Sequence, residues 1–85
     1  MAWELKLKAS VEKDLKKIAP KEVESIFDGL MKVLEDPRSQ GKSLKGDKKG
    51  FWRYRFGKYR AICDIQDEVL VVLVVRVGHR GEIYR

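Results

Sequence analysis

The stretch Val69-Leu70-Val71-Val72-Leu73-Val74-Val75 decides the fold of this chain. It is apolar at every position and rich in β-branched residues, which favours a strand that is buried on both faces. The run is far shorter than the about 20 residues that a membrane-spanning helix needs. We therefore predict an inner strand of a sheet at about 69–77 and no membrane segment.

Two further strands precede this run and form a hairpin. They are predicted at about 51–56 and 59–66, and they meet at Gly57-Lys58, where a glycine suits the first central position of a type II′ turn. This turn sets Arg55 opposite Arg60 and Arg53 opposite Ile62, and opposed residues share a face of the sheet. One face then carries three arginines, and the other carries the side chains that belong under the helices: Trp52, Tyr54, Phe56, Tyr59, Ala61, Cys63 and Ile65.

The N-terminal half of the sequence predicts one strand and two helices. Residues 2–8 alternate between apolar and polar, as in a strand with one wet face. Ser10 suits the N-cap of a short first helix, and Pro20 suits the first turn of a longer second helix. Along the second helix, which Asp36-Pro37 ends, an apolar stripe is expected: Val23, Ile26, Phe27, Leu30, Met31 and Leu34.

These elements predict a single α+β domain over residues 1–85, in the order β-α-α-β-β-β. The helices need cover for their apolar stripes, and the sheet needs cover on one face. We therefore expect the two N-terminal helices to pack on one face of a mostly antiparallel four-stranded sheet. A chain of this size buries only about 60–65% of its unfolded surface, which argues against an enzyme with a bound organic cofactor.

The composition indicates a polyanionic partner. The 19 Lys+Arg against 13 Asp+Glu give a net charge of +6, and nucleic acid is the commonest partner of such a chain. One cysteine, Cys63, and one histidine offer no disulfide and no zinc-ligand spacing, so we expect no metal and a reducing cytoplasm. The loop at 38–50 carries lysines that either contact an RNA backbone or form a solvated surface: Lys42, Lys45, Lys48 and Lys49.

The predicted pairing of Arg55 with Arg60 normally costs stability, from a few tenths to about 1 kcal/mol. A phosphate between the two guanidinium groups would remove this repulsion, because the planar fork of arginine matches phosphate oxygens. In the alternative, both side chains splay into solvent, where salt screens the repulsion. Arg76 is a further candidate for the same trough, but the sequence leaves open which face of the sheet it takes.

RNA carries its own nucleophile, the 2′-hydroxyl, so its cleavage requires proton transfer and stabilisation of a phosphorane but no metal. Arginines aimed at the phosphorane stabilise its charge. Tyr84 and His79 are candidates for the proton transfers. In the alternative, Tyr84 covers the edge of the sheet and His79 is a turn residue.

Several segments of the chain resemble the RelE family of toxins, small basic ribonucleases of bacterial and archaeal toxin–antitoxin systems that cut mRNA on the ribosome. The early segments, which are shared with the related ParE toxins, are 10–18, the helix exit at 34–38 and Leu44-Lys45-Gly46. The segments that discriminate RelE are the 52–60 hairpin and the end of the chain, where Gly78-His79-Arg80 is followed by Ile83-Tyr84-Arg85.

This resemblance implies a role for each site residue. Tyr84 would be the general base, Arg80 the partner of the leaving group or the phosphorane, and Arg55 and Arg60 the clamp on the transition state. Family members often have lysines where this hairpin has arginines, so His79 or Arg80 would have to replace a lysine as general acid. The remaining basic residues would bind the RNA backbone: Lys42, Lys45, Lys48, Lys49, Arg53 and Arg76.

The implied partners are mRNA and 16S rRNA in the ribosomal A site, and a RelB-like antitoxin that covers the arginine trough. Two other hypotheses stay open. A ParE-like inhibitor of DNA gyrase would need no catalytic tyrosine, and a non-catalytic RNA-binding module would bind RNA without cutting it.

Overall fold

The computed structural model describes residues 2–44 and 50–79. In chain order the elements are β1 (Glu4–Leu7), α1 (Ala9–Lys16), α2 (Pro20–Val33), β2 (Lys42–Ser43), β3 (Trp52–Phe56), β4 (Tyr59–Gln66) and β5 (Val71–His79). The strands form one sheet in the order β1-β5-β4-β3-β2, in which β1 runs parallel to β5 and the other neighbours are antiparallel.

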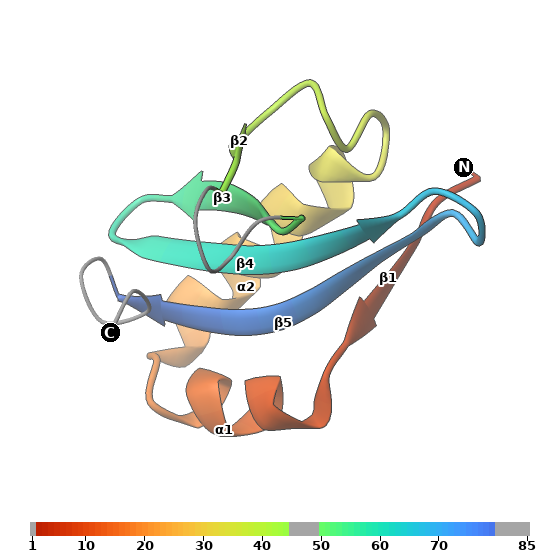
Figure 1. The fold of residues 1–85 in the computed structure, drawn as a ribbon. Helices are drawn as coiled ribbons and strands as arrows, with labels where there is room; N and C mark the ends of the chain where they lie inside the picture. Colours follow the sequence, from red (N-terminus) through yellow and green to blue (C-terminus); the bar gives the residue numbers. More distant parts are fainter. Residues whose placement is uncertain (1, 45–49, 80–85) are drawn as a thin grey trace.

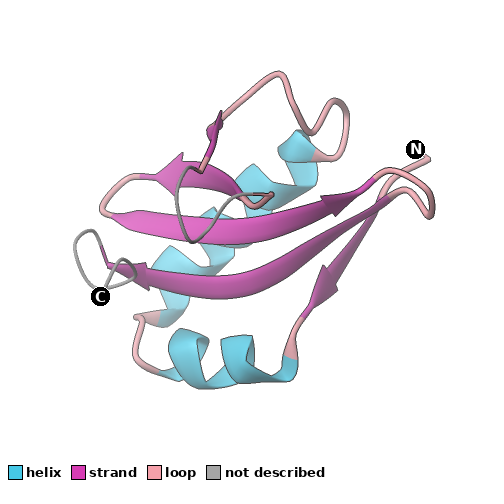
Figure 2. Ribbon diagram, viewed as in Figure 1, coloured by secondary structure: helices cyan, strands magenta, loops and turns pink. Residues whose placement is uncertain are grey.

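The helices and the sheet enclose one core. Figure 1 shows α2 behind the sheet and α1 alongside β5, and Figure 2 distinguishes helices from strands by colour. Buried side chains from both helices and from β3, β4 and β5 form a single hydrophobic cluster. The predicted α+β class and the mostly antiparallel sheet are therefore confirmed. No helix in the described part of the chain is long and apolar enough to cross a membrane.

The predicted number of strands is wrong by one, because β2 gives the sheet five strands within residues 2–44 and 50–79. This strand has only two residues and lies in the segment expected to be a basic loop. Lys42 pairs with Arg53 and Ser43 with Trp52. Two residues are too few to show the alternation that marks a strand in a sequence. β2 is therefore defined only by its pairing with β3.

The apolar run forms an inner strand, as predicted, since β5 lies between β1 and β4. The strand begins at Val71 and not at Val69, which is 64% exposed. Leu70 has a φ of 54°, and its N–H donates to the carbonyl of Asp67. The first two residues of the run therefore belong to the β4–β5 turn.

The first helix starts differently from the prediction. Ser10 is not its N-cap: α1 begins at Ala9, and Lys8 takes the capping position without a side-chain capping bond. The N–H of Lys8 still donates to the carbonyl of Val74 on β5. Pairing with the sheet therefore extends to the residue before the helix, and it fixes the start of the helix in place of a capping side chain.

The second helix begins at Pro20, as predicted, but one member of its stripe is different. Ile26, Leu30 and Val33 are buried, whereas Met31 is 48% exposed. The buried residues have spacings of four and three, which keep them on one side of the helix. Met31 therefore lies at the solvent-exposed edge of this stripe, and Val33 is buried in the core instead.

The β3–β4 hairpin has the predicted register in all five pairs, including Arg55 opposite Arg60. Gly57 has a φ of 61°. Lys58, the second central residue, does not have a positive φ. Because a type II′ turn has a positive φ at its first central residue alone, the turn is of type II′ as expected. Tyr54, Ala61 and Cys63 are at most 1% exposed, so their face lies against the core and the arginines lie on the other face.

Candidate functional site

The face of the sheet turned away from α2 is strongly basic, and we call it the arginine face. One row across it joins Lys42 to Arg53, Arg53 to Ile62 and Ile62 to Arg76. The next row joins Arg55 to Arg60 and Arg60 to Gly78. From the ordinary spacings within a sheet, the Cα atoms of the four arginines lie within roughly 12 Å of one another. The cations of these two rows are Lys42, Arg53, Arg55, Arg60 and Arg76.

Arg76 reaches this face because of a β-bulge. From Gln66 to Cys63, β4 pairs with residues 71–74, but the register then shifts, so that Ile62 faces Arg76 and not Val75. Without the extra residue, strict alternation would direct Arg76 towards the core and Val75 towards the arginine face. The bulge therefore adds a fourth arginine to the group.

Arg60 is the centre of the arginine face. It is 6% exposed, and among the residues that the structure describes it is the one buried charged side chain. The interpretation in which both hairpin arginines splay into solvent is therefore wrong for Arg60, although Arg55 is exposed. Burial holds the Arg60 guanidinium in place before any ligand arrives, which is the preorganisation that stabilises developing negative charge.

Asp64 also lies on this face, where it pairs with Leu73 at the end away from the hairpin turn. Its Oδ2 accepts a hydrogen bond of 3.0 Å from Nε2 of Gln66. This carboxylate reduces the net positive charge at the end of the arginine face that lies past Arg53 and Arg76.

His79 lies on the opposite face. It pairs with Tyr59, and the two rings meet edge to face with centroids 5.7 Å apart and an interplanar angle of 87°. The structure therefore does not bring His79 together with the arginine face. The other predicted site residues lie outside the described part of the chain: Arg80, Tyr84, Lys45, Lys48 and Lys49.

The segment that leads to Lys42 is tied to the sheet by side chains of β3. The hydroxyl of Tyr54 donates to the carbonyl of Pro37 at 2.5 Å, and Nε1 of Trp52 donates to the carbonyl of Gln40 at 2.6 Å. Burial raises the pKa of the Tyr54 phenol, so this donor stays protonated. These ties place Lys42 beside Arg53.

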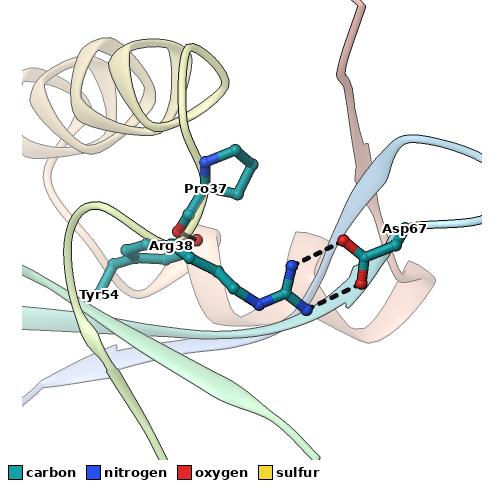
Figure 3. A network of polar contacts seen from close by, with 4 residues as sticks. All are labelled: Pro37, Arg38, Tyr54 and Asp67. Atoms are coloured by element: carbon teal, nitrogen blue, oxygen red, sulfur yellow. Dashed lines mark hydrogen bonds and ion pairs between the residues drawn. The ribbon is translucent and has the colours of Figure 1, made fainter.

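A third tie joins the same segment to the β4–β5 turn. Figure 3 shows the guanidinium of Arg38 facing the carboxylate of Asp67, with N···O distances of 2.6 and 2.8 Å. The hydrogen bond from Arg38 holds the pKa of Asp67 below its usual range.

Sequence reasoning missed all these ties, because they join residues far apart in the chain. The one local signal was Gly41, whose φ of 75° and lack of a side chain bring the backbone against β3. A Cβ at this position would lie 2.2 Å from the carbonyl oxygen of Arg53.

Comparisons with known proteins agree with this architecture. A family model described as the ParE toxin of type II toxin–antitoxin system, parDE, matches residues 5–84. Toxin RelG of Mycobacterium tuberculosis is 30% identical over 86 residues, which cover 100% of this chain and 99% of that toxin.

Solved structures are similar over almost the whole chain. The toxin–antitoxin complex RelBE2 from Mycobacterium tuberculosis matches with a TM-score of 0.87 and 26% identity, covering 94% of this chain and 100% of the other. The isolated E. coli RelE toxin matches with a TM-score of 0.78 and 29% identity, covering 98% and 92%. The intact E. coli RelBE complex matches with a TM-score of 0.79 and 26% identity, covering 95% and 100%. The likeness is therefore to whole toxin chains.

Proposed function

Because this chain belongs to the ParE toxin family of type II toxin–antitoxin systems, within the RelE/ParE superfamily, we propose that it is a ribosome-dependent endoribonuclease. In this proposal the toxin cleaves translated mRNA in the ribosomal A site. The attacking group is the 2′-hydroxyl of the RNA itself, and no metal takes part.

The observation that carries the proposal is the buried guanidinium of Arg60 opposite that of Arg55, with Arg53 and Arg76 beside them. The phosphorane formed by 2′-hydroxyl attack gathers negative charge on its oxygens. Donors fixed in advance around this charge lower the barrier, and the loss of one such donor commonly costs about 3–4 kcal/mol. An RNA phosphate also removes the repulsion between two opposed cations.

Each residue has a stated role in this proposal. Arg55 and Arg60 clamp the phosphorane, and Lys42, Arg53 and Arg76 hold the RNA backbone. Two further roles rest on the family resemblance, since their residues lie outside the described part of the chain. Tyr84 takes the proton from the 2′-hydroxyl, and Arg80 assists the phosphorane or the leaving 5′-oxygen. Lys45, Lys48 and Lys49 add backbone contacts.

The proposed partners follow from the charge of the site. Two of the similar structures are complexes of a toxin with its antitoxin. We propose that a RelB-like antitoxin with acidic charge covers the arginine face of this toxin directly. The same basic surface would contact mRNA and 16S rRNA once the antitoxin has left.

Primer extension on a translated mRNA tests the proposed activity. We expect Arg55→Ala and Tyr84→Phe each to reduce cleavage by about 100-fold or more, the usual effect of removing one such group. Lys21→Ala is the matched control, because Lys21 is exposed on α2 and lies off the arginine face. Full cleavage by both active-site variants would dismiss these roles.

The same assay separates the alternatives. Intact message together with DNA damage would indicate a ParE-like gyrase inhibitor. This alternative is kept because the matching family model is described as a ParE toxin. Salt-sensitive RNA binding without cleavage, even with ribosomes present, would indicate a non-catalytic RNA-binding module.

A further inference from the structure

A second concave site lies at the outer edge of β5, beyond the end of β1. β1 pairs with residues 71–74 of β5 only, because the chain then leaves the sheet and enters α1. A pocket of about 250 Å³ opens where the last residues of β5, the end of α1 and the start of β4 meet. Its size is below the range of sites for drug-sized ligands and suits one planar ring system.

The lining of this pocket includes a carboxylate that the fold holds in place. Oδ2 of Asp14 accepts a hydrogen bond of 3.0 Å from the backbone N–H of Val77. Because β1 has ended, no strand of the described residues pairs with this edge of β5 here, and Asp14 takes the place of a strand carbonyl. Each carboxylate oxygen accepts more than one hydrogen bond, so Asp14 still offers acceptor sites to a ligand.

The walls of the pocket combine aromatic rings with cations. Tyr59 and His79 are the aromatic pair described above, and Lys17 and Arg76 also line the pocket. Rings for stacking and cations for phosphate are the combination with which proteins bind single-stranded RNA.

The pocket adjoins the arginine face. Arg76 contributes to both, and Gly78, which also lines the pocket, lies directly opposite Arg60 on β4. Neighbouring strands are about 4.8 Å apart. An RNA strand with a phosphate at Arg60 therefore meets this pocket when it passes over the edge of β5.

We propose that this pocket binds one nucleobase of the RNA next to the cleaved linkage, with a preference for guanine; the inference rests on the proposed function for its substrate. Guanine fits the carboxylate best, because its N1–H and N2–H groups are adjacent donors that one carboxylate accepts together. The base stacks on His79 or Tyr59, and Lys17 and Arg76 attract the phosphates on either side.

Nuclear magnetic resonance tests the pocket without ribosomes and without cleavage. The ¹⁵N-labelled toxin is titrated with GMP, AMP, CMP and UMP, and with ribose 5-phosphate as the ligand that lacks a base. We expect GMP to shift the backbone amide signals of Tyr59, Val77 and His79 at the lowest concentration. Equal shifts with ribose 5-phosphate, or no shifts, would overturn the proposal.

Two variants locate the contacts. His79→Ala should weaken GMP binding by at least about fivefold, the lower bound for the loss of one base–aromatic stack. Asp14→Asn keeps an oxygen acceptor for Val77 but adds a donor, so it should remove the preference for GMP over AMP. Lys21→Ala should leave both unchanged. If both pocket variants bind like the wild type, the assignment fails.

A second readout connects the pocket to the substrate. In ribosomal cleavage reactions, Asp14→Asn should change the distribution of bases at one position beside the cut. An unchanged distribution in an active toxin would refute the substrate assignment. If the wild type did not cleave mRNA at all but GMP still bound selectively, the nucleobase site would stand and the proposed function would fail.

Discussion

At the scale of single residues, Arg55 and Arg60 lower the stability of the fold by their mutual repulsion, but the same pair suits the binding of a phosphate. Like charges directly across two strands are unfavourable. Arg60 is buried and Arg55 is exposed, so the pair cannot relax by moving both side chains into solvent. The arrangement is therefore expected to be more stable with an anion bound, and less stable without one.

Replacing Arg55 by threonine should stabilise the toxin while it reduces cleavage by about 100-fold or more. Removal of the repulsion should raise the free energy of unfolding by a few tenths to about 1 kcal/mol, and threonine suits a strand. Urea unfolding followed by circular dichroism measures the change. Arg76→Thr is the matched control, because Arg76 faces Ile62 and is paired with no cation among the described residues, and no gain is expected there. A gain of equal size in the control would contradict this argument.

Cys63 should be chemically inert in the native toxin. Its side chain is fully buried, and burial raises the pKa of its thiol to about 12, so almost no thiolate exists at pH 8. Labelling with a disulfide reagent should be slow in buffer and fast in urea. The stability that this thiol contributes is present at neutral pH and is lost as the pH rises towards 12. Rapid, complete labelling of the folded protein at pH 8 would rule out this account.

At the scale of elements, the sequence predicted those parts whose signals are local. Gly57-Lys58 set the register of the hairpin, and Pro20 set the start of α2. The start of α1 and the strand β2 were missed, because contacts with β5 and β3 define them. The position of Arg55 opposite Arg60 could be predicted from the turn. The face on which Arg76 lies could not be predicted, because a bulge of one residue decides it and no sequence pattern marks this bulge.

Gly41→Ala should detach the segment that carries Lys42, whereas Gly50→Ala should not. Both glycines have positive φ, at 75° and 97°, so alanine is strained at either position. A Cβ at Gly41 would also meet the carbonyl of Arg53 at 2.2 Å, but no atom of the described residues lies within 4 Å of a Cβ at Gly50. We expect a cost of about 1–2 kcal/mol at Gly50 from backbone strain alone, and a larger one at Gly41.

The indole N–H of Trp52 reports this difference, since it donates to the carbonyl of Gln40 next to Gly41. Its proton resonance should shift in Gly41→Ala and stay in place in Gly50→Ala. Cleavage should fall only in the first variant if Lys42 holds the RNA. Equal costs and equal spectra would show that the close approach of Gly41 to β3 is unimportant.

At the scale of the whole molecule, the division of the sheet into two faces joins stability to function. The helices cover one face, so the apolar side chains of the hairpin and of β5 form the core on that side. The other face carries the cations Lys42, Arg53, Arg55, Arg60 and Arg76. The same alternation of side chains along each strand therefore builds the core and the basic surface.

This division predicts how salt weakens RNA binding. For single-stranded RNA, the logarithm of affinity falls with the logarithm of salt concentration, with a slope of about −0.7 for each phosphate neutralised. An RNA with 2′-O-methyl groups lacks the nucleophile, so its binding can be measured by fluorescence anisotropy between 50 and 300 mM KCl. Arg76→Ser should reduce the magnitude of the slope by about 0.7, because one phosphate contact on the arginine face is lost. Lys21→Ser removes the same charge from α2 and should leave the slope unchanged. If both variants change the slope equally, net charge rather than the arginine face attracts the RNA.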